Sequence, residues 1–165
     1  MYSGTTDNPF HISVGAVLSN KNDKICCHRF ITKDVVFLED LSINELHLLM
    51  RETMEDGESF SAAVARGLQE EFGAEGEISH YLGAIQSHFP NKDEVSIEKT
   101  TLYFHVDCAE FDPAKRDDND PESVSEIVWL EPRDLIEKMK HQSEKLDRTD
   151  LDESSIIERY LQYVD

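Results

Sequence analysis

Short runs of apolar residues, separated by clusters of polar turn-forming residues, occupy the first fifty positions of the chain. Residues 10–20 form a mostly apolar run of β-type composition, and a polar cluster leads from it into a second run that ends at Phe30. Two such runs joined by a short turn predict a β-hairpin. Two further apolar runs, Asp34–Leu41 and Glu45–Thr53, are each compatible with a strand or an irregular crossing segment, and we favour a strand at Leu46–Arg51.

The hydrophobic period changes to that of a helix after Ser59, which is a candidate N-cap. The apolar residues of the next segment fall within about 100° of one another on a helical wheel. They are Val64, Ala65, Leu68 and Phe72. The opposite side of the wheel carries Arg66, Gly67, Glu70 and Glu71. Because Gly73 stands where a glycine commonly ends a helix, we expect a short helix that buries one face and presents acids on the other.

The second half of the chain contains two long runs rich in β-branched and aromatic residues, at 77–89 and 99–111. The turn-like residues between them predict a second, longer hairpin. Residues 112–126 are acidic, contain two prolines and lack periodicity, which predicts a solvated loop. Residues 127–139 then pass from a short strand into a helix, and apolar residues at helical spacing within 150–164 predict a last helix.

Strands before, between and after a helix indicate an α+β or mixed α/β/α layered domain. A length of 165 residues suffices for one compact domain and is short for two. The chain has three cysteines, two of them adjacent, which suggest no disulfide framework, so a reducing cytoplasm is expected. The first residues show no basic segment ahead of an apolar run, and no apolar stretch approaches the roughly 18 residues of a membrane span, so we expect a soluble protein.

The charge balance limits the partners. The chain carries 35 acidic and 16 basic residues, a formal net charge of −19. This charge argues against a nucleic acid duplex, because phosphate backbones are held by basic surfaces. It remains compatible with an anionic small molecule, provided that a local Arg/Lys cluster or bound divalent cations supply the counter-charge.

The acidic side of the predicted helix contains the candidate chemistry. Positions 67, 70 and 71 are neighbours there, since residues three and four apart have Cβ atoms roughly 5–6 Å from each other. Carboxylates packed that closely raise one another's pKa unless a cation neutralises them, and a hard divalent ion such as Mg²⁺ prefers such oxygens. A Glu pair standing alone in so acidic a chain is more commonly a solvated helix face.

The surrounding residues resemble the Nudix hydrolase motif, which reads Gly, five residues, Glu, seven residues, Arg-Glu, a bulky apolar residue, any residue, Glu-Glu, any residue and Gly. The matching positions are Glu58, Arg66, Leu68, Glu70, Glu71 and Gly73. Two positions depart, because Glu52 replaces the opening glycine and Gly67 replaces the glutamate after the arginine. The flanking runs also look like those of the family, so the resemblance covers roughly residues 10–139.

The resemblance implies an α+β fold, the Nudix-type α/β/α sandwich with a mixed β-sheet and the Nudix helix. It would occupy residues 1–165 as a single domain, with a core at about 10–139 and a C-terminal helix at about 153–164. The implied activity is a hydrolase, dependent on Mg²⁺ or Mn²⁺, that cleaves the diphosphate bond of a nucleoside diphosphate linked to another moiety. Many relatives dimerise, so a homodimer is a further expectation.

The resemblance also assigns roles to individual residues. Glu70 and Glu71 are the implied metal ligands, and the loop entering the motif would offer the metal a backbone carbonyl near Arg51. Arg66 would hold the acids in place through charge-assisted hydrogen bonds, with Glu58 as its partner. The alternative for Arg66 is an ordinary surface pair with Glu70, worth about 0.3–0.5 kcal/mol.

Gly67 puts the activity in question. The acid that the family has at this position is a metal ligand and in some members the general base, and a positioned base is typically worth about 10²–10⁴ in rate. An acid from outside the helix could replace it. We favour Glu98, and the other candidates are Glu94, Asp93, Glu52 and Glu55. Two other functions stay open: a catalytically silent Nudix domain that binds a nucleotide or protein partner, and a Nudix-fold enzyme of different chemistry, such as an isoprenoid diphosphate isomerase or a sugar hydrolase.

The remaining polar and aromatic residues give weaker signals. The histidines of the long hairpin are His80, His88 and His105. No pair of them has the spacing of a compact zinc site, although His88 could border a substrate cleft. The aromatic residues that could stack on a nucleobase are Tyr103, Phe104 and Trp129, for which packing in the core is the commoner role. Lys99 and Arg29 are candidate phosphate clamps.

Overall fold

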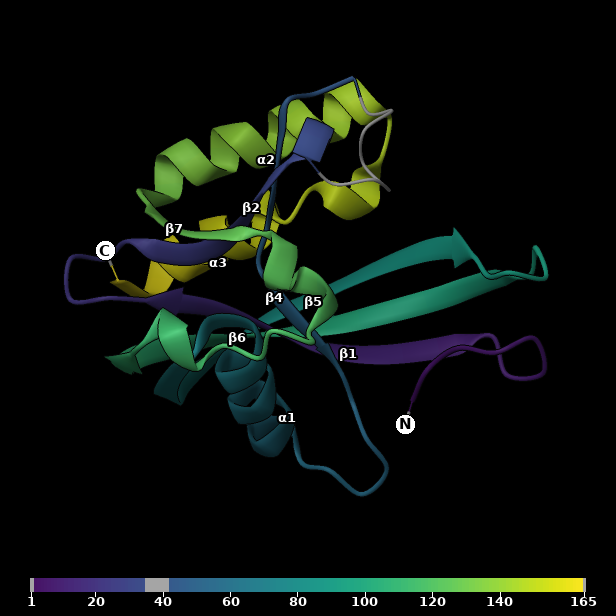
Figure 1. Ribbon diagram of the computed structural model, residues 1–165, viewed down its shortest axis with the longest axis horizontal. Helices are drawn as coiled ribbons and strands as arrows, with labels where there is room; N and C mark the ends of the chain where they lie inside the picture. Colours follow the sequence, from purple (N-terminus) through teal and green to yellow (C-terminus); the bar gives the residue numbers. More distant parts are fainter. Residues whose placement is uncertain (1, 35–41, 165) are drawn as a thin grey trace.

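The computed structural model describes residues 2–34 and 42–164 (Figure 1). The apolar run expected at Asp34–Leu41 lies, beyond Asp34, outside these residues. Within the described part of the chain, no helix is long and apolar enough to cross a membrane.

The described residues form a seven-stranded mixed sheet. Its strands are β1 (Phe10–Ser19), β2 (Ile25–Ile31), β3 (Glu45–Leu48), β4 (Met50–Thr53), β5 (Ala74–Pro90), β6 (Ser96–Phe111) and β7 (Glu126–Leu130). The order is β3-β2-β1-β6-β5, with β4 also paired to β1 and β7 to β2. β1 and β6 run parallel, and both predicted hairpins, β1 with β2 and β5 with β6, are present as antiparallel pairs.

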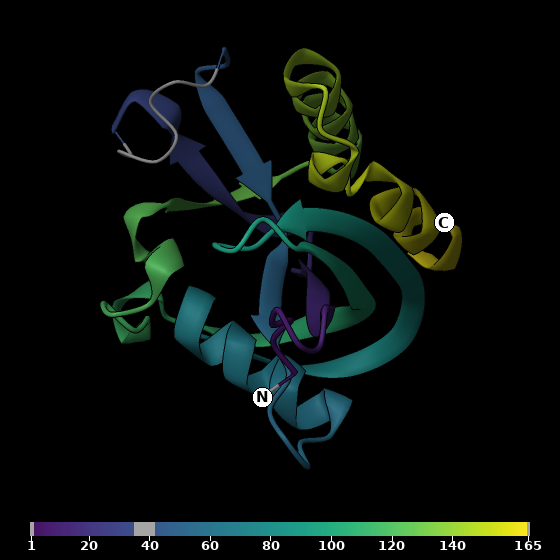
Figure 2. The ribbon, with the colours of Figure 1, turned by 90° about the vertical axis from the view of Figure 1, so that its right-hand side faces the viewer.

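Helices cover the two faces of this sheet, which gives the expected α/β/α sandwich. α1 (Phe60–Gly67) packs on one face, while α2 (Pro132–Leu146) and α3 (Ser154–Val164) pack on the other (Figure 1). The sheet is strongly curled, and β5 and β6 wrap around one side of it (Figure 2). The register of β5 against β6 shifts at several bulges, and such bulges bend a strand and increase its twist.

The alternation of side chains along β1 separates the two cores, because successive residues of a strand point to opposite faces. Val14, Ala16 and Leu18 belong to the cluster shared with α1, whereas Val17 belongs to the cluster shared with α2 and α3. Phe72 follows α1 and is completely buried in the first cluster. Burying one such side chain stabilises the fold by roughly 1.5–3 kcal/mol.

The strand predicted at Leu46–Arg51 is divided in two. β3 pairs with β2, and β4 pairs with β1, so the chain crosses from one neighbour to the other at Leu49. The backbone N–H of Leu49 donates to Glu153 Oε2 at 2.8 Å instead of to a strand. Glu153 precedes α3 and is fully buried. Its carboxylate accepts the hydrogen bond of a backbone N–H that has no strand partner, and this contact fixes the start of β4.

The helical-wheel prediction was right about the ends of the helix and wrong about one of its faces. The Ser59 side chain accepts a hydrogen bond from the Ala62 N–H at 3.2 Å, and Gly73 ends the helix with a φ of 61°. However, α1 continues into a π-helical turn, η2 (Leu68–Phe72). The i→i+5 pattern of that turn changes the angular positions of its residues relative to an α-helix. Gly67 and Glu71, which the wheel places on the solvated side, are buried, and Ala65, which it places in the core, is exposed.

The segment expected to be a solvated loop is partly built into the fold. Residues 112–126 contain two short 3₁₀ helices, Pro113–Lys115 and Pro121–Val124. Arg116 crosses back to hydrogen-bond the carbonyl oxygens of Glu122 and Ser125. Most of the segment is exposed, as predicted, and the prediction missed these contacts because they leave no periodicity in the sequence. The last helix, α3, begins and ends as predicted within the limits of the pattern, and Ile156, Ile157 and Tyr160 are buried.

We expect Glu153→Ala to lower the free energy of unfolding by about 3–5 kcal/mol, because it leaves buried donors without an acceptor. The donors concerned are the Leu49 N–H and the Tyr103 hydroxyl. Urea denaturation measures the change. The control is Glu158→Ala in α3, which removes an exposed pair with Lys140 and should cost less than about 1 kcal/mol. Equal costs for the two variants would contradict this role of Glu153.

Candidate functional site

Arg66, at the end of α1, gathers the acids around it. Its Nε and Nη2 donate to the two oxygens of Glu58 at 3.1 and 3.0 Å, and Nη2 also donates to the Thr53 carbonyl at 2.9 Å. Its Nη1 lies 3.0 Å from Glu52 Oε1 and 3.5 Å from Glu70 Oε2. The pairing with Glu58 that the family resemblance implies is therefore present. Arg66 is more than a surface partner of Glu70, because its guanidinium ties the helix to β4 and to the loop between them.

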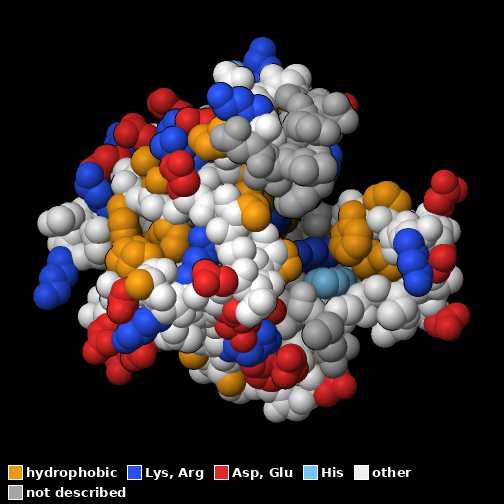
Figure 3. All heavy atoms as spheres, viewed as in Figure 1, with side chains coloured by type: hydrophobic (Ala, Val, Ile, Leu, Met, Phe, Trp, Pro, Cys, Tyr) orange, Lys and Arg blue, Asp and Glu red, His pale blue; other side chains and the backbone are white. Residues whose placement is uncertain are grey.

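The electrostatics follow from this geometry. The hydrogen bonds from Arg66 hold the pKa of Glu58 below its ordinary value. Burial raises the pKa of Glu70, opposed by the charge of Arg66 and reinforced by that of Glu52. Figure 3 shows Asp and Glu side chains gathered around a few Lys and Arg side chains in the lower centre of the face.

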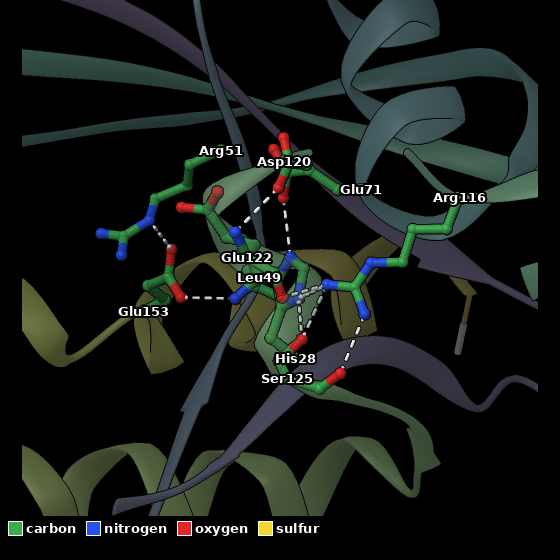
Figure 4. A network of polar contacts seen from close by, with 9 residues as sticks. All are labelled: His28, Leu49, Arg51, Glu71, Arg116, Asp120, Glu122, Ser125 and Glu153. Carbon is green, nitrogen blue, oxygen red and sulfur yellow. Dashed lines mark hydrogen bonds and ion pairs between the residues drawn. The ribbon is translucent and has the colours of Figure 1, made fainter. Parts of the chain in front are cut away.

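Glu71 lies on the buried side of the same turn, with only 2% of its side chain exposed. Its Oε2 is 2.7 Å from His28 Nε2, and His28 Nδ1 is 2.7 Å from Ser125 Oγ (Figure 4). Arg116 Nη2 donates to that serine oxygen at 2.9 Å. Because an ionised carboxylate only accepts, a neutral His28 carries its proton on Nε2 and donates it to Glu71, and its Nδ1 accepts from the Ser125 hydroxyl.

The pKa values agree with a neutral histidine in this chain of contacts. Burial, with the charge of Arg116 second, lowers the pKa of His28 to about 3. Burial, with the charges of Glu122 and Glu52 next, raises the pKa of Glu71 well above its ordinary value. The backbone N–H of Arg51 opposes that rise by hydrogen-bonding the carboxylate. Glu71 is thus held in a fixed orientation, at the cost of repulsion from the acids around it.

A small cavity of about 70 Å³ opens beside Glu71. Its walls are formed by His28, Leu48, Leu49, Arg51, Glu71, Lys99 and Glu122. Burial, with the charge of Arg51 second, lowers the pKa of Lys99 to about 8. Burial, together with the neighbouring Asp120, raises the pKa of Glu122 to about 7. The cavity therefore has cationic and acidic side chains on its walls. A larger hollow of about 630 Å³, between α2 and residues 42–47, contains none of the candidate acids.

The structure separates the acids that were candidates to replace the one missing at position 67. Glu98, the favoured one, accepts a hydrogen bond from Gln86 at 2.6 Å and lies 3.9 Å from His88, so its contacts are with β5. Since Lys99 lines the cavity, its neighbour Glu98 points to the opposite face of β6. The acids of the β5–β6 turn, Asp93 and Glu94, and the loop residue Glu55 are exposed. Of the five, Glu52 is the one in contact with Arg66.

The weaker candidates mostly have structural partners. Tyr103 donates to Glu153 and His105 lies 2.8 Å from Ser19 Oγ, so both belong to buried contacts. Trp129 packs edge-on against Phe111. Arg29 pairs with two exposed acids at the sheet surface. Of the two candidate clamps, only Lys99 lines the cavity.

Sequence reasoning missed four residues of this site: His28, Arg116, Glu122 and Ser125. His28 comes from β2, and the other three come from the segment taken for a solvated loop. Pairing of β2 with β7 brings the end of that segment over the buried glutamate. The sequence signal for the missed residues of this segment was an unusual mixture of Arg and Pro in an otherwise acidic loop. That composition does not indicate which residues they contact.

A divalent cation fits the donor chemistry of this site. Glu70, Glu71 and a backbone carbonyl near Arg51 are oxygen donors of the kind that Mg²⁺ prefers. Burial, reinforced by the negative charge of Glu52, raises the pKa of both glutamates, and a bound cation would neutralise the repulsion among these acids. Among the described residues, no three His, Cys, Asp or Glu side chains already converge as a ready-made ligand group. Glu70, with 39% of its side chain exposed, has room to turn toward an ion.

Comparison with known proteins decides the family. The family model of the NUDIX domain matches residues 9–149, most of the chain. The chain belongs to the Nudix family. No curated protein matches it, so the family is established by the domain model, and this agrees with the resemblance of residues 52–73 to the Nudix motif.

Solved structures support the Nudix fold. A Nudix hydrolase from Nitrosomonas europaea is similar with a TM-score of 0.61 and 19% identity, over 93% of this chain and 89% of that one. A MutT protein from Methanosarcina mazei Go1 is similar with a TM-score of 0.50 and 18% identity, over 88% of this chain and 99% of that one. At such identities the likeness shows the shared fold, and the chemistry has to be argued from the site.

Glu122 gives a test of the electrostatics. Its pKa is raised from 4.5 to about 7 in the folded protein. The free energy of unfolding that this shift contributes is therefore fully present below pH 4.5, and it is lost as the pH rises through 7. We therefore expect Glu122→Gln to become more stable relative to the unmodified protein between pH 5 and pH 8, by on the order of 2–3 kcal/mol at most.

Urea denaturation at both pH values measures this difference, with EDTA present so that no cation masks the repulsion. The control is Glu126→Gln, which removes an exposed carboxylate from the same part of the chain. It shows what the loss of an exposed carboxylate does to the free energy of unfolding at each pH, and the result for Glu122→Gln is compared with it. A difference in free energy of unfolding between Glu122→Gln and the unmodified protein that stays constant from pH 5 to pH 8 would contradict the raised pKa of Glu122.

Proposed function

We propose that this Nudix protein is a hydrolase, dependent on Mg²⁺ or Mn²⁺, that cleaves the diphosphate bond of a nucleoside diphosphate linked to another moiety. The observation that carries the proposal is the cavity beside the Nudix helix, in which Glu71 and Glu122 face the same space as Arg51 and Lys99. A chain with a net charge of −19 repels an anionic substrate over most of its surface. Cations at this one cavity, together with a bound metal, supply the local attraction that a diphosphate needs.

Each residue of the site has a separate role in the proposed reaction. Glu70, Glu71 and the carbonyl near Arg51 would hold the cation, which neutralises a diphosphate and polarises its phosphoryl oxygen. Arg66 positions Glu70 through its Nη1, and His28 positions Glu71. Lys99 would bind a phosphate oxygen of the substrate through a charge-assisted hydrogen bond.

Proton transfer is assigned to Glu122. Its pKa of about 7 leaves much of it ionised at neutral pH, which suits a general base. Water attacks one phosphorus, its proton passes to Glu122, and the bond from that phosphorus to the bridging oxygen breaks. The products are a nucleoside monophosphate and the phosphorylated second moiety.

A test of the activity uses a panel of NTPs, ADP-ribose, NADH, dinucleoside polyphosphates and nucleotide sugars, with Mg²⁺ or Mn²⁺. We expect turnover that is lost in EDTA and restored by the metal. Glu70→Gln and Glu71→Gln should each lower kcat by about 10²-fold or more, because each removes a charged oxygen from the cation. Glu75→Gln, an exposed acid just beyond the motif, should leave kcat unchanged. Turnover that persists in both glutamine variants would contradict the assignment of the ligands.

Lys99→Gln tests the phosphate contact. The substitution should raise KM about tenfold with a smaller effect on kcat, because a contact made equally to substrate and transition state affects binding. Steady-state kinetics on the best substrate of the panel measures it. The matched control is Lys92→Gln at the exposed β5–β6 turn, for which KM should not change. An unchanged KM for Lys99→Gln would place the substrate elsewhere.

A catalytically silent Nudix domain is the second candidate, favoured by the burial of Glu71 and its existing hydrogen bond to His28. A silent domain would be stabilised by a nucleotide of the panel, seen as a higher melting temperature, and would release no product with either metal. Product release in the same samples excludes this candidate.

A further inference from the structure

The two positions at which the chain departs from the Nudix motif lie against each other. The motif has glycine at the position of Glu52 and glutamate at the position of Gly67, so the two residue types are exchanged. Glu52 stands in β4, paired with Val14 of β1. Gly67 ends α1 and is buried against that strand. Along the sequence, Gly67 looks like the loss of an acid. In the folded chain, the glycine and the glutamate of the motif have exchanged places at two neighbouring positions.

The space between α1 and β4 at these two positions can hold a side chain from the helix or from the strand, but not from both. A Cβ added to Gly67 would lie 2.8 Å from Glu52 Cβ and 3.3 Å from Glu52 Cγ. It would also lie 2.8 Å from Met50 Sδ, in a flexible side chain that can shift. The Cβ of Glu52 is fixed to the strand backbone and cannot withdraw. A glutamate at both positions therefore does not fit, and Gly67 leaves its place to the Glu52 side chain.

The Glu52 carboxylate ends among the acids of the helix. Its Oε1 lies 3.0 Å from Arg66 Nη1, the same nitrogen that is 3.5 Å from Glu70 Oε2. Only 16% of the Glu52 side chain is exposed. The charge of Arg66 is already met by the two oxygens of Glu58, so neutralising this arginine does not require a further acid. Glu52 brings an extra negative charge to the place where the motif would put one.

We propose that Glu52 supplies the third carboxylate of the cation site, so that the Nudix motif of this chain is transposed between strand and helix and retains its full set of acids. The inference rests on the proposed function, because it assumes that Glu70 and Glu71 bind a divalent cation. It differs from the expectation that favoured Glu98, whose contacts lie on β5.

The test measures Mn²⁺ affinity of the full chain by electron paramagnetic resonance of the free ion, without substrate. We expect Glu52→Gln to weaken Mn²⁺ binding about tenfold or more, because affinity for hard cations follows the number of charged ligands. Glutamine keeps the volume of the side chain and a hydrogen bond to Arg66, so this variant folds if the role is a cation ligand. Glu55→Gln, an exposed acid nearby in sequence, is the control and should bind Mn²⁺ like the unmodified protein.

A reciprocal exchange gives the second measurement. Glu52→Gly should weaken Mn²⁺ binding like Glu52→Gln, and Gly67→Glu alone should lower the melting temperature because its Cβ meets Glu52. The double variant Glu52→Gly, Gly67→Glu should recover both Mn²⁺ affinity and melting temperature, since it places the acid on the helix and the glycine on the strand. Recovery of both properties in the double variant would show that one position replaces the other, because independent effects of the two substitutions would add.

The inference is overturned if Glu52→Gln binds Mn²⁺ as tightly as the unmodified protein. It is also overturned if the unmodified protein binds no Mn²⁺, or if a folded double variant does not recover the affinity. Failure of the proposed function looks different: Mn²⁺ binding would depend on Glu52, and no substrate of the panel would be cleaved.

Discussion

A single guanidinium joins the three segments on which the site depends. Arginine presents five N–H donors in one plane, and Arg66 uses them on the loop before the helix through Glu58, on the end of β4 through the Thr53 carbonyl, and on the helix itself through Glu70. Strand, loop and helix are therefore held at fixed distances by one side chain. The acids can be brought close together because this positive charge stands among them.

Local signals in the sequence were enough for the framework. Both hairpins, the helix between Ser59 and Gly73, and α2 and α3 follow from periodicity, capping and turn residues, which act over a few positions. These features could be predicted because each is determined by residues that are neighbours in the chain or on one helix. The contact between Arg66 and Glu58 was instead implied by the resemblance to the Nudix motif.

Contacts between distant segments could not be predicted in this way. Leu49 interrupts a strand because its N–H is taken by Glu153, 104 positions away. His28 reaches Glu71 across 43 positions, and Ser125 joins them only because β7 pairs with β2. The helical wheel failed at Gly67 and Glu71 because it assumes an ideal α-helix exposed on one side. In the structure the helix is packed against β4 at Gly67 and continues into a wider turn.

The close approach of Gly67 to Glu52 also bears on how such a motif can change during evolution. Starting from the usual arrangement, a substitution that adds glutamate to the strand first creates an overlap with the helix glutamate, and one that removes glutamate from the helix first leaves the site one acid short. Either single step is disfavoured, so an ancestor with the usual arrangement and this chain are separated by a barrier that two coordinated substitutions cross. Once the exchange has occurred, reversion is hindered by the same overlap, and a lineage carrying it would be expected to keep both residues together.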